Sequence, residues 1–126
     1  METNIMVADE NETKRHEEDT HEKLVCDIIS EIDSNIYAVK SVEQLARDYS
    51  ISSGHIKNIF KKHTGITIFE YLFEKRMSAA KDLLDNTDLK VYEIAEKLGY
   101  KSKAFFSRAF QRHIGTTPSQ YRKRDK

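Results

Sequence analysis

The sequence predicts an all-α protein built from two copies of one helical unit that are joined by a long helix. The 126 residues include one proline and four glycines, too few for the many turns of a β-barrel or a β-sandwich. Apolar residues recur at helical spacing along most of the chain. The apolar pattern of the first half also returns in the second half at a nearly constant offset, which indicates an internal repeat.

The first helix is expected to begin near Asp19 or Thr20 and to end near Ser34, because its apolar residues follow the helical period. These residues are Leu24, Val25, Ile28, Ile29 and Ile32. Residues 1–19 show no such period and carry seven acidic side chains against two basic ones. They are therefore expected to form an acidic flexible tail or linker.

Two short helices and a tight turn are expected next, over about residues 41–64. Ser41 is followed three residues later by Gln44, which is the capping-box pattern of a helix start. A polar break at residues 50–53 separates the two helices. A further capping box, Thr67 with Glu70, begins the longest helix, at about residues 67–86, and Phe69 is expected to belong to its apolar stripe.

The second half repeats this order over about residues 90–113. Val91, Ile94, Ala95 and Leu98 follow Val42, Leu45, Ala46 and Tyr49 at an offset of 49 residues. After one extra residue in the turn the offset becomes 50, as in the pairs Phe60 and Phe110, His63 and His113, Gly65 and Gly115, and Tyr71 and Tyr121. Ala46 and Ala95 each precede a turn by four residues, which favours a helix-turn-helix in both halves.

Basic residues concentrate on the second helix of each pair, although the formal net charge of the chain is zero. The segment 52–63 contains three lysines and the segment 101–113 contains two lysines and two arginines, and neither has an acidic residue. Residues 121–126 carry four basic side chains against Asp125. An acid-free helix face is favourable beside phosphates. The pattern therefore favours binding to double-stranded DNA through the second helix of each pair.

Residues 21–124 resemble the DNA-binding domain of the AraC/XylS family of bacterial transcription regulators. The resemblance rests on the order and spacing of four stretches, 60–65, 71–84, 94–100 and 106–122. It implies a seven-helix domain over residues 20–126, in which two helix-turn-helix subdomains are joined by a long linker helix. It further implies a cytoplasmic bacterial regulator, associated with the nucleoid when bound, that activates transcription and contacts RNA polymerase.

The resemblance places the base-contacting positions on the second helix of each pair, and residue chemistry adds Phe105 as a partner for a thymine methyl group. The full set is Ser53, Gly54, Lys57, Asn58, Lys103, Ala104, Phe105, Ser107 and Arg108. Arg108 can bind a guanine edge in bidentate fashion, and Asn58 an adenine edge. Phosphate contacts are expected from Lys61, Lys62 and Arg112 and from the helix starts at Ser41, Thr116 and Thr117.

The long helix predicts how the protein engages DNA. Twenty helical residues span about 30 Å, and successive major grooves on one face of DNA lie about 34 Å apart. One chain could therefore place both recognition helices in adjacent grooves and bind an asymmetric site as a monomer. If the spacing falls short, the DNA must bend or one helix must disengage.

Other function classes find little support in the sequence. No nucleophile elbow or glycine-rich phosphate loop occurs, so an enzyme is not expected. One cysteine and five scattered histidines do not make a metal-ligand set, and no cofactor or membrane span is expected. The alternative is a helical adaptor or anti-regulator that binds protein without sequence-specific DNA binding. It would need an exposed apolar stripe, and none is expected once the core is assigned.

The same sequence leaves two architectures open. The chain is either a short stand-alone regulator or the output end of a longer protein, with the acidic segment as a linker.

Overall fold

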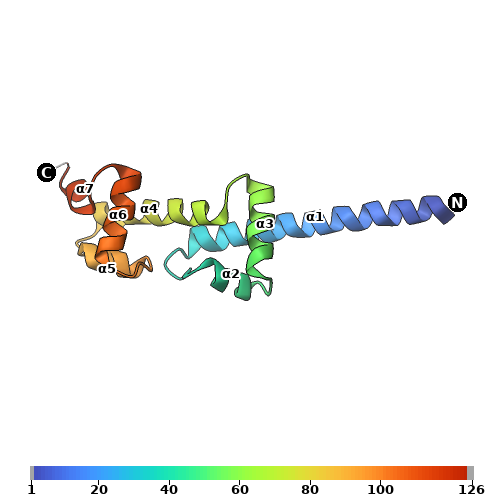
Figure 1. The fold of residues 1–126 in the computed structure, drawn as a ribbon, viewed down its shortest axis with the longest axis horizontal. Helices are drawn as coiled ribbons and strands as arrows, with labels where there is room; N and C mark the ends of the chain where they lie inside the picture. Colours follow the sequence, from blue (N-terminus) through green and yellow to red (C-terminus); the bar gives the residue numbers. More distant parts are fainter. Residues whose placement is uncertain (1, 125–126) are drawn as a thin grey trace.

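The computed structural model describes residues 2–124, with side chains from Arg15 onward. Within that range every regular element is an α-helix, and seven helices follow one another along the chain (Figure 1). They are α1 (Glu2–Ser34), α2 (Val42–Asp48), α3 (Ser53–Thr64), α4 (Ile68–Asn86), α5 (Val91–Lys97), α6 (Lys103–Ile114) and α7 (Pro118–Lys123). The prediction of an all-α fold with two helix-turn-helix subdomains and a long linker helix is confirmed.

The predicted start of the first helix is wrong, because α1 begins at Glu2 and not near Asp19 or Thr20. The segment before residue 20 lacks an apolar stripe, but a helix that is already nucleated by packing can be extended without one. Val25, Ile28 and Ile32 supply that packing farther along α1. Many residues of the early segment, among them Glu, Lys, Arg and Ala, also have good helix propensity. That residues 1–19 serve as a flexible linker stays a prediction.

The buried side chains form two separate cores at two places along α4. The first core is built by α1, α2, α3 and the start of α4. Its largest fully buried side chains are Ile28, Ile32, Leu45, Ile56, Phe60 and Ile68. The second core is built by the later part of α4, by α5 and by α6, and includes Met77, Ile94, Phe106 and Phe110. Figure 1 shows the two groups of helices arranged along the axis of α4.

Two equivalent tyrosines reveal that α4 belongs to both units. Tyr71, near the start of α4, donates its hydroxyl hydrogen bond to Asp33 at the end of α1, over 2.7 Å. Tyr121 in α7 donates in the same way to Asp85 at the end of α4, over 3.4 Å. The end of α1 thus supports the first unit as the end of α4 supports the second. The start of α4 therefore belongs to the first unit and its end belongs to the second.

The hydrogen bond of Tyr71 predicts a pH effect on stability. Burial first, and then the hydrogen bond and charge of Asp33, raise the pKa of Tyr71 to about 12. An unfolded tyrosine titrates near pH 10, so the folded state retains this proton to higher pH. The contribution of Tyr71 should be complete below pH 10 and lost between pH 10 and 12. We expect the stability advantage of the parent over Tyr71→Phe, measured by urea unfolding, to shrink across that range; a constant difference would contradict this.

The turns of the two helix-turn-helix units have the same backbone geometry. Ser50 and Gly99 both adopt positive φ, 58° and 83° respectively. In each turn the following N–H bonds back over 2.9 Å, from Ile51 to the carbonyl of Ala46 and from Tyr100 to the carbonyl of Ala95. Glycine adopts this conformation without strain, whereas serine does not. The first turn therefore contains a local strain that the second avoids.

Separate substitutions of Ser50 and Gly99 should change the free energy of unfolding in opposite directions. We expect Ser50→Gly to raise the free energy of unfolding by about 0.5–1 kcal/mol, and Gly99→Ala to lower it by about 1–2 kcal/mol. A Cβ atom at Gly99 would meet no heavy atom within 4 Å, so the penalty there comes from the backbone alone. Urea unfolding measures both changes. Equal stability of the parent and Gly99→Ala would contradict the prediction.

Contacts besides α4 itself also link the two units. Tyr37, in the connection between α1 and α2, packs against the second core, and its ring centroid lies 4.8 Å from the Nζ atom of Lys97 in α5. Arg76, in the middle of α4, donates to the carbonyl oxygens of Val39 and Lys40 over 3.3 and 3.4 Å. Burial lowers the pKa of Arg76, and the nearby Tyr100 hydroxyl opposes that shift. These contacts hold the second unit in a defined orientation relative to the first.

Candidate nucleic-acid interface

The outward face of α3 carries most of the predicted contacts of the first unit. Ser52 caps the helix, its hydroxyl oxygen accepting the N–H of His55 over 3.1 Å. Ile56, Ile59 and Phe60 are directed into the first core. The helical period then leaves another face toward solvent, with Gly54, Lys57, Asn58, Lys61 and Lys62. All five border one groove of about 540 Å³.

The outward face of α6 is organised in the same way. The Ser102 hydroxyl caps the helix through the N–H of Phe105, over 3.2 Å, and Phe106 and Phe110 are fully buried. The exposed residues include Lys103, Ala104, Phe105, Arg108 and Arg112. The guanidinium carbon of Arg108 lies 5.0 Å from the ring centroid of Phe105, within cation–π range. Phe105, Arg108 and Arg112 border a second groove, of about 590 Å³.

The two outward faces are both cationic, and the helices that carry them run in the same direction. Neither α3 nor α6 contains an acidic residue along its whole length. Figure 1 shows the two helices crossing the axis of α4 at separate places and running in the same direction. We call α3 and α6 the recognition helices. Together they present two cationic, acid-free surfaces that are compatible with a polyanion.

The predicted base-contacting residues differ in their exposure to solvent. Gly54, Asn58, Lys103, Ala104 and Arg108 are exposed on the recognition helices. Ser53 and Ser107 are half-buried, and so is Lys57, which lies over a phenylalanine ring of α4.

The predicted phosphate-contacting hydroxyls lie at helix starts, away from these two grooves. The Oγ atom of Ser41 accepts the N–H of Gln44 over 3.0 Å, and Thr117 accepts the N–H of Gln120 over 3.2 Å. Each hydroxyl uses its oxygen as a helix cap and keeps its own hydrogen to donate. Thr116 is exposed just before the start of α7. These positions remain compatible with phosphate contacts.

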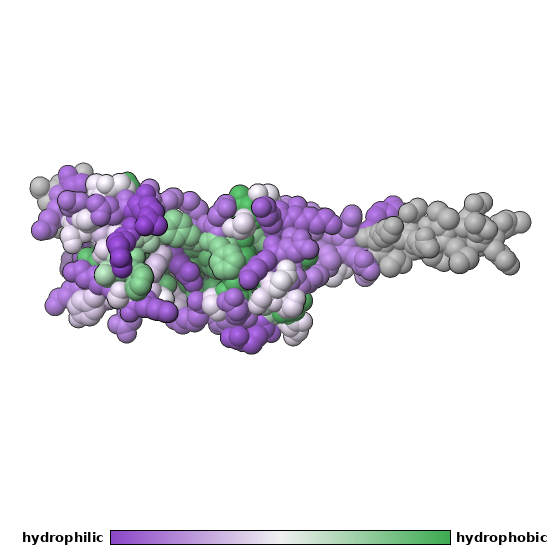
Figure 2. Space-filling model, in the orientation of Figure 1, coloured by the Kyte–Doolittle hydropathy of each residue, from purple (hydrophilic) through white to green (hydrophobic). Residues whose placement is uncertain are grey.

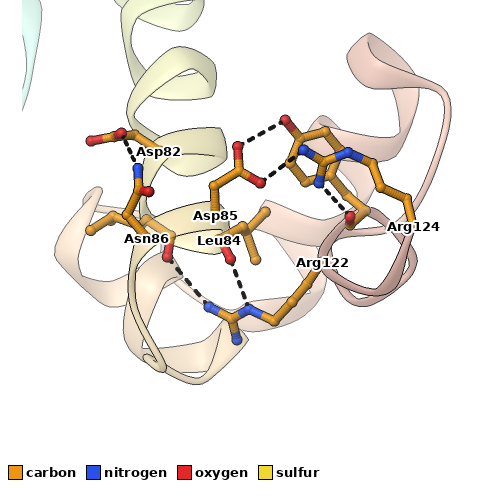
Figure 3. Close-up of polar contacts among 8 residues, drawn as sticks. Asp82, Leu84, Asp85, Asn86, Arg122 and Arg124 are labelled. Atoms are coloured by element: carbon orange, nitrogen blue, oxygen red, sulfur yellow. Dashed lines mark hydrogen bonds and ion pairs between the residues drawn. The ribbon is translucent and has the colours of Figure 1, made fainter. Parts of the chain in front are cut away.

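The basic residues at the end of the chain are largely engaged in holding the fold. Arg122 donates to the carbonyl oxygens of Leu83, Leu84, Thr87 and Leu89 over distances from 2.6 to 3.4 Å. Arg124 forms an ion pair with Asp85 at 2.9 Å (Figure 3). The expectation that residues 121–126 act with the other two segments as a surface for a polyanion is therefore corrected for these two arginines. Residues 125–126 lie outside the described part of the chain.

Phe69 differs from its predicted position. The sequence pattern predicts that Phe69 belongs to the apolar stripe of α4, but its side chain is 52% exposed, while the adjacent Ile68 is buried. Ile66, Tyr92 and Phe105 are also exposed. The exposure of Phe105 is compatible with its predicted contact with a thymine methyl group, whereas that of Phe69 was not expected. Figure 2 shows hydrophobic surface between α6 and α3, over α4, on the side of the molecule that it displays.

The described residues give no indication of a metal site, since no group of three or more His, Cys, Asp or Glu side chains among them could hold an ion. None of the described helices combines the length and apolar character needed to cross a membrane.

Comparison with known proteins identifies the family. A model of the helix-turn-helix domain matches residues 45–124. The regulatory protein SoxS of Escherichia coli (strain K12) is 32% identical over 105 residues, which cover 83% of this chain and 98% of SoxS. The HTH-type transcriptional regulator YdiP of the same strain is 34% identical over 103 residues, which cover 82% of this chain but 34% of YdiP. The chain thus spans about a third of YdiP and nearly all of SoxS.

A solved structure extends the likeness to three dimensions. The DNA-binding domain of AdpA, a global transcriptional factor solved in complex with a target DNA, matches with a TM-score of 0.69 at 26% identity. The match covers 78% of this chain and 88% of that domain. Together with the two cationic recognition helices, these similarities show that the chain belongs to the AraC family of helix-turn-helix, DNA-binding transcription regulators.

Proposed function

We propose that this protein binds an asymmetric site on double-stranded DNA as a monomer, with α3 and α6 in adjacent major grooves. The observation that carries the proposal is the repeated recognition helix, acid-free on both occasions and oriented alike along α4. Base contacts come from Ser53, Gly54, Lys57, Asn58, Lys103, Ala104, Phe105, Ser107 and Arg108. Phosphate contacts come from Ser41, Lys61, Lys62, Arg112, Thr116 and Thr117.

The length of α4 is close to the spacing of adjacent major grooves but somewhat shorter, which affects the shape of the bound DNA. Its 19 residues span about 28 Å, somewhat less than the groove repeat of about 34 Å. Simultaneous engagement of both recognition helices then requires the DNA to bend toward the protein. Smooth bending of a site of this size costs about 1–6 kcal/mol, which the additional contacts must offset.

Selection of bound sequences from a random DNA pool at stated salt tests the proposal. We expect an enriched site with two conserved segments about one helical turn apart. Footprinting of that site should then give a protected stretch spanning two turns. Protection no greater than that given by any cationic protein, or limited to one turn, would contradict the proposal and favour a protein-binding adaptor or anti-regulator.

We further propose that the bound protein activates transcription by contacting RNA polymerase in a bacterial cytoplasm, where DNA binding associates it with the nucleoid. The support is its membership of the AraC family together with the resemblance stated above. Transcription in vitro from a promoter carrying the selected site should increase when the protein is added to purified RNA polymerase. A decrease would indicate a repressor.

Lys62 provides a test of sequence-independent binding. Its exposed ammonium group lies near the end of α3, where we place a phosphate. We expect Lys62→Ala to weaken binding to all sequences alike, and to reduce the slope of log affinity against log salt by about one. Lys23→Ala is the control, because Lys23 lies on α1 beside Asp27 and outside the proposed interface. If Lys62→Ala loses affinity only for sequences that differ at one base position, Lys62 contacts a base and not a phosphate.

A further inference from the structure

An apolar side chain occupies an unusual position beside the first recognition helix. Phe69 lies in the first turn of α4 and is 52% exposed, whereas Ile68 before it is fully buried. The internal repeat offers a direct comparison, since the equivalent residue of the second unit, 50 positions later, is the exposed Ser119. An exposed phenylalanine here is therefore a feature of the first unit and not of the repeated fold.

Phe69 forms part of the floor of the groove between α3 and the start of α4. Gly54, Lys57, Asn58, Lys61 and Lys62 border the groove on the α3 side, and Thr67, Ile68 and Phe69 on the α4 side. Three lysines thus surround an apolar floor, and no carboxylate is among the residues that line it.

One of these lysines is held by the aromatic ring itself. The Nζ atom of Lys57 lies 5.2 Å from the centroid of the Phe69 ring. This cation is therefore placed by a π-face, which leaves its charge unneutralised. A groove with an apolar floor and an uncompensated cationic rim is complementary to a chain that alternates apolar and anionic groups. The sugar–phosphate backbone of DNA has that composition.

We propose that this groove holds the sugar–phosphate backbone of one DNA strand, with Phe69 packed against deoxyribose and Lys61 and Lys62 beside the flanking phosphates, while Lys57, held over the Phe69 ring, faces the bases. The inference rests on the proposed function, because the groove shares Gly54, Lys57 and Asn58 with the base-facing surface of α3. It makes Phe69 a contact residue that fixes how α3 sits beside the strand.

The test compares Phe69→Ser, which reproduces the residue of the second unit, with Phe69→Leu, which keeps an apolar side chain. Both variants should fold as the parent does, because Phe69 is half exposed. We expect Phe69→Ser to weaken binding to selected and random sequences alike, on the order of fivefold, and Phe69→Leu to retain most of the affinity. The salt dependence should stay as in the parent, since no cation is removed.

Hydroxyl-radical footprinting locates the contact, because the radical attacks exposed deoxyribose. We expect Phe69→Ser to lose protection at a short run of sugars beside the α3 half of the site, while protection at the α6 half persists. Parental affinity and an unchanged sugar footprint in Phe69→Ser would overturn the inference. So would a change in self-association, measured by sedimentation, with unchanged DNA binding, because the groove would then hold a second copy of the chain.

The parent protein separates failure of this inference from failure of the proposed function. If the parent shows no two-turn footprint on any selected site, the proposed function fails. If the parent shows that footprint and Phe69→Ser shows it unaltered, only the role of Phe69 fails.

Discussion

Replacing Phe110 by alanine is expected to unfold the second unit while the first unit remains folded. The Phe110 side chain is fully buried, with its ring centroid 5.8 Å from that of Phe106 and 5.5 Å from that of Tyr121. Truncating a buried phenylalanine costs about 3–5 kcal/mol, a large part of the stability of a small domain. The first core contains none of these side chains, so it should persist.

Hydrogen exchange resolved by residue measures this effect, since amides of α5 and α6 should lose protection while those of α2 and α3 keep it. The footprint should shrink to the α3 half of the site. Phe60→Ala is the matched variant in the first unit, and it should give the opposite pattern. Equal loss of protection in both units for either variant would show that the two cores fold as one cooperative body.

Replacing Arg108 by alanine is expected to weaken binding to the selected site by about 1–3 kcal/mol and to relax the preference at one base position. Arg108 is exposed on α6, and its guanidinium lies against the ring of Phe105. A guanidinium in that position can donate two hydrogen bonds to a guanine edge. Binding to a panel of operators, each with one base pair changed, measures the loss of preference.

Arg108→Lys separates charge from geometry. It keeps the positive charge but loses the planar pair of donors, so its binding to random DNA should resemble that of the parent while its base preference falls. If Arg108→Ala discriminates among the operator panel as the parent does, Arg108 does not contact a base.

The helix starts and the repeat could be predicted from sequence because their signals are local. Ser41, Thr67 and Thr117 cap α2, α4 and α7, as their side chains and spacing indicate. The faces of α3 and α6 follow in turn from the buried positions Ile56, Phe60, Phe106 and Phe110, since the helical period then fixes which residues point outward.

Other features could not be predicted because they depend on distant partners or on a choice between neighbours. Two adjacent apolar residues, Ile68 and Phe69, begin α4, and only the packing of α1 and α3 decides which of them is buried. The carbonyl partners of Arg122 lie more than 30 residues away in the chain. The start of α1 at Glu2 could not be predicted because the early part of the helix has no periodic apolar residues, although its residues are compatible with a helix.

Because α3 and α6 run in the same direction, the proposed complex with DNA would have a defined orientation along the duplex. Proteins with twofold symmetry meet a palindrome identically from either end. In the proposed complex, α3 and α6 would both meet the DNA strands in the same direction, so the two half-sites would form a tandem repeat and not an inverted one. Inverting such an operator within a promoter would turn the protein around, so that α1 points upstream where it had pointed downstream. The same sequence in two orientations would then present opposite ends of the regulator to its neighbours.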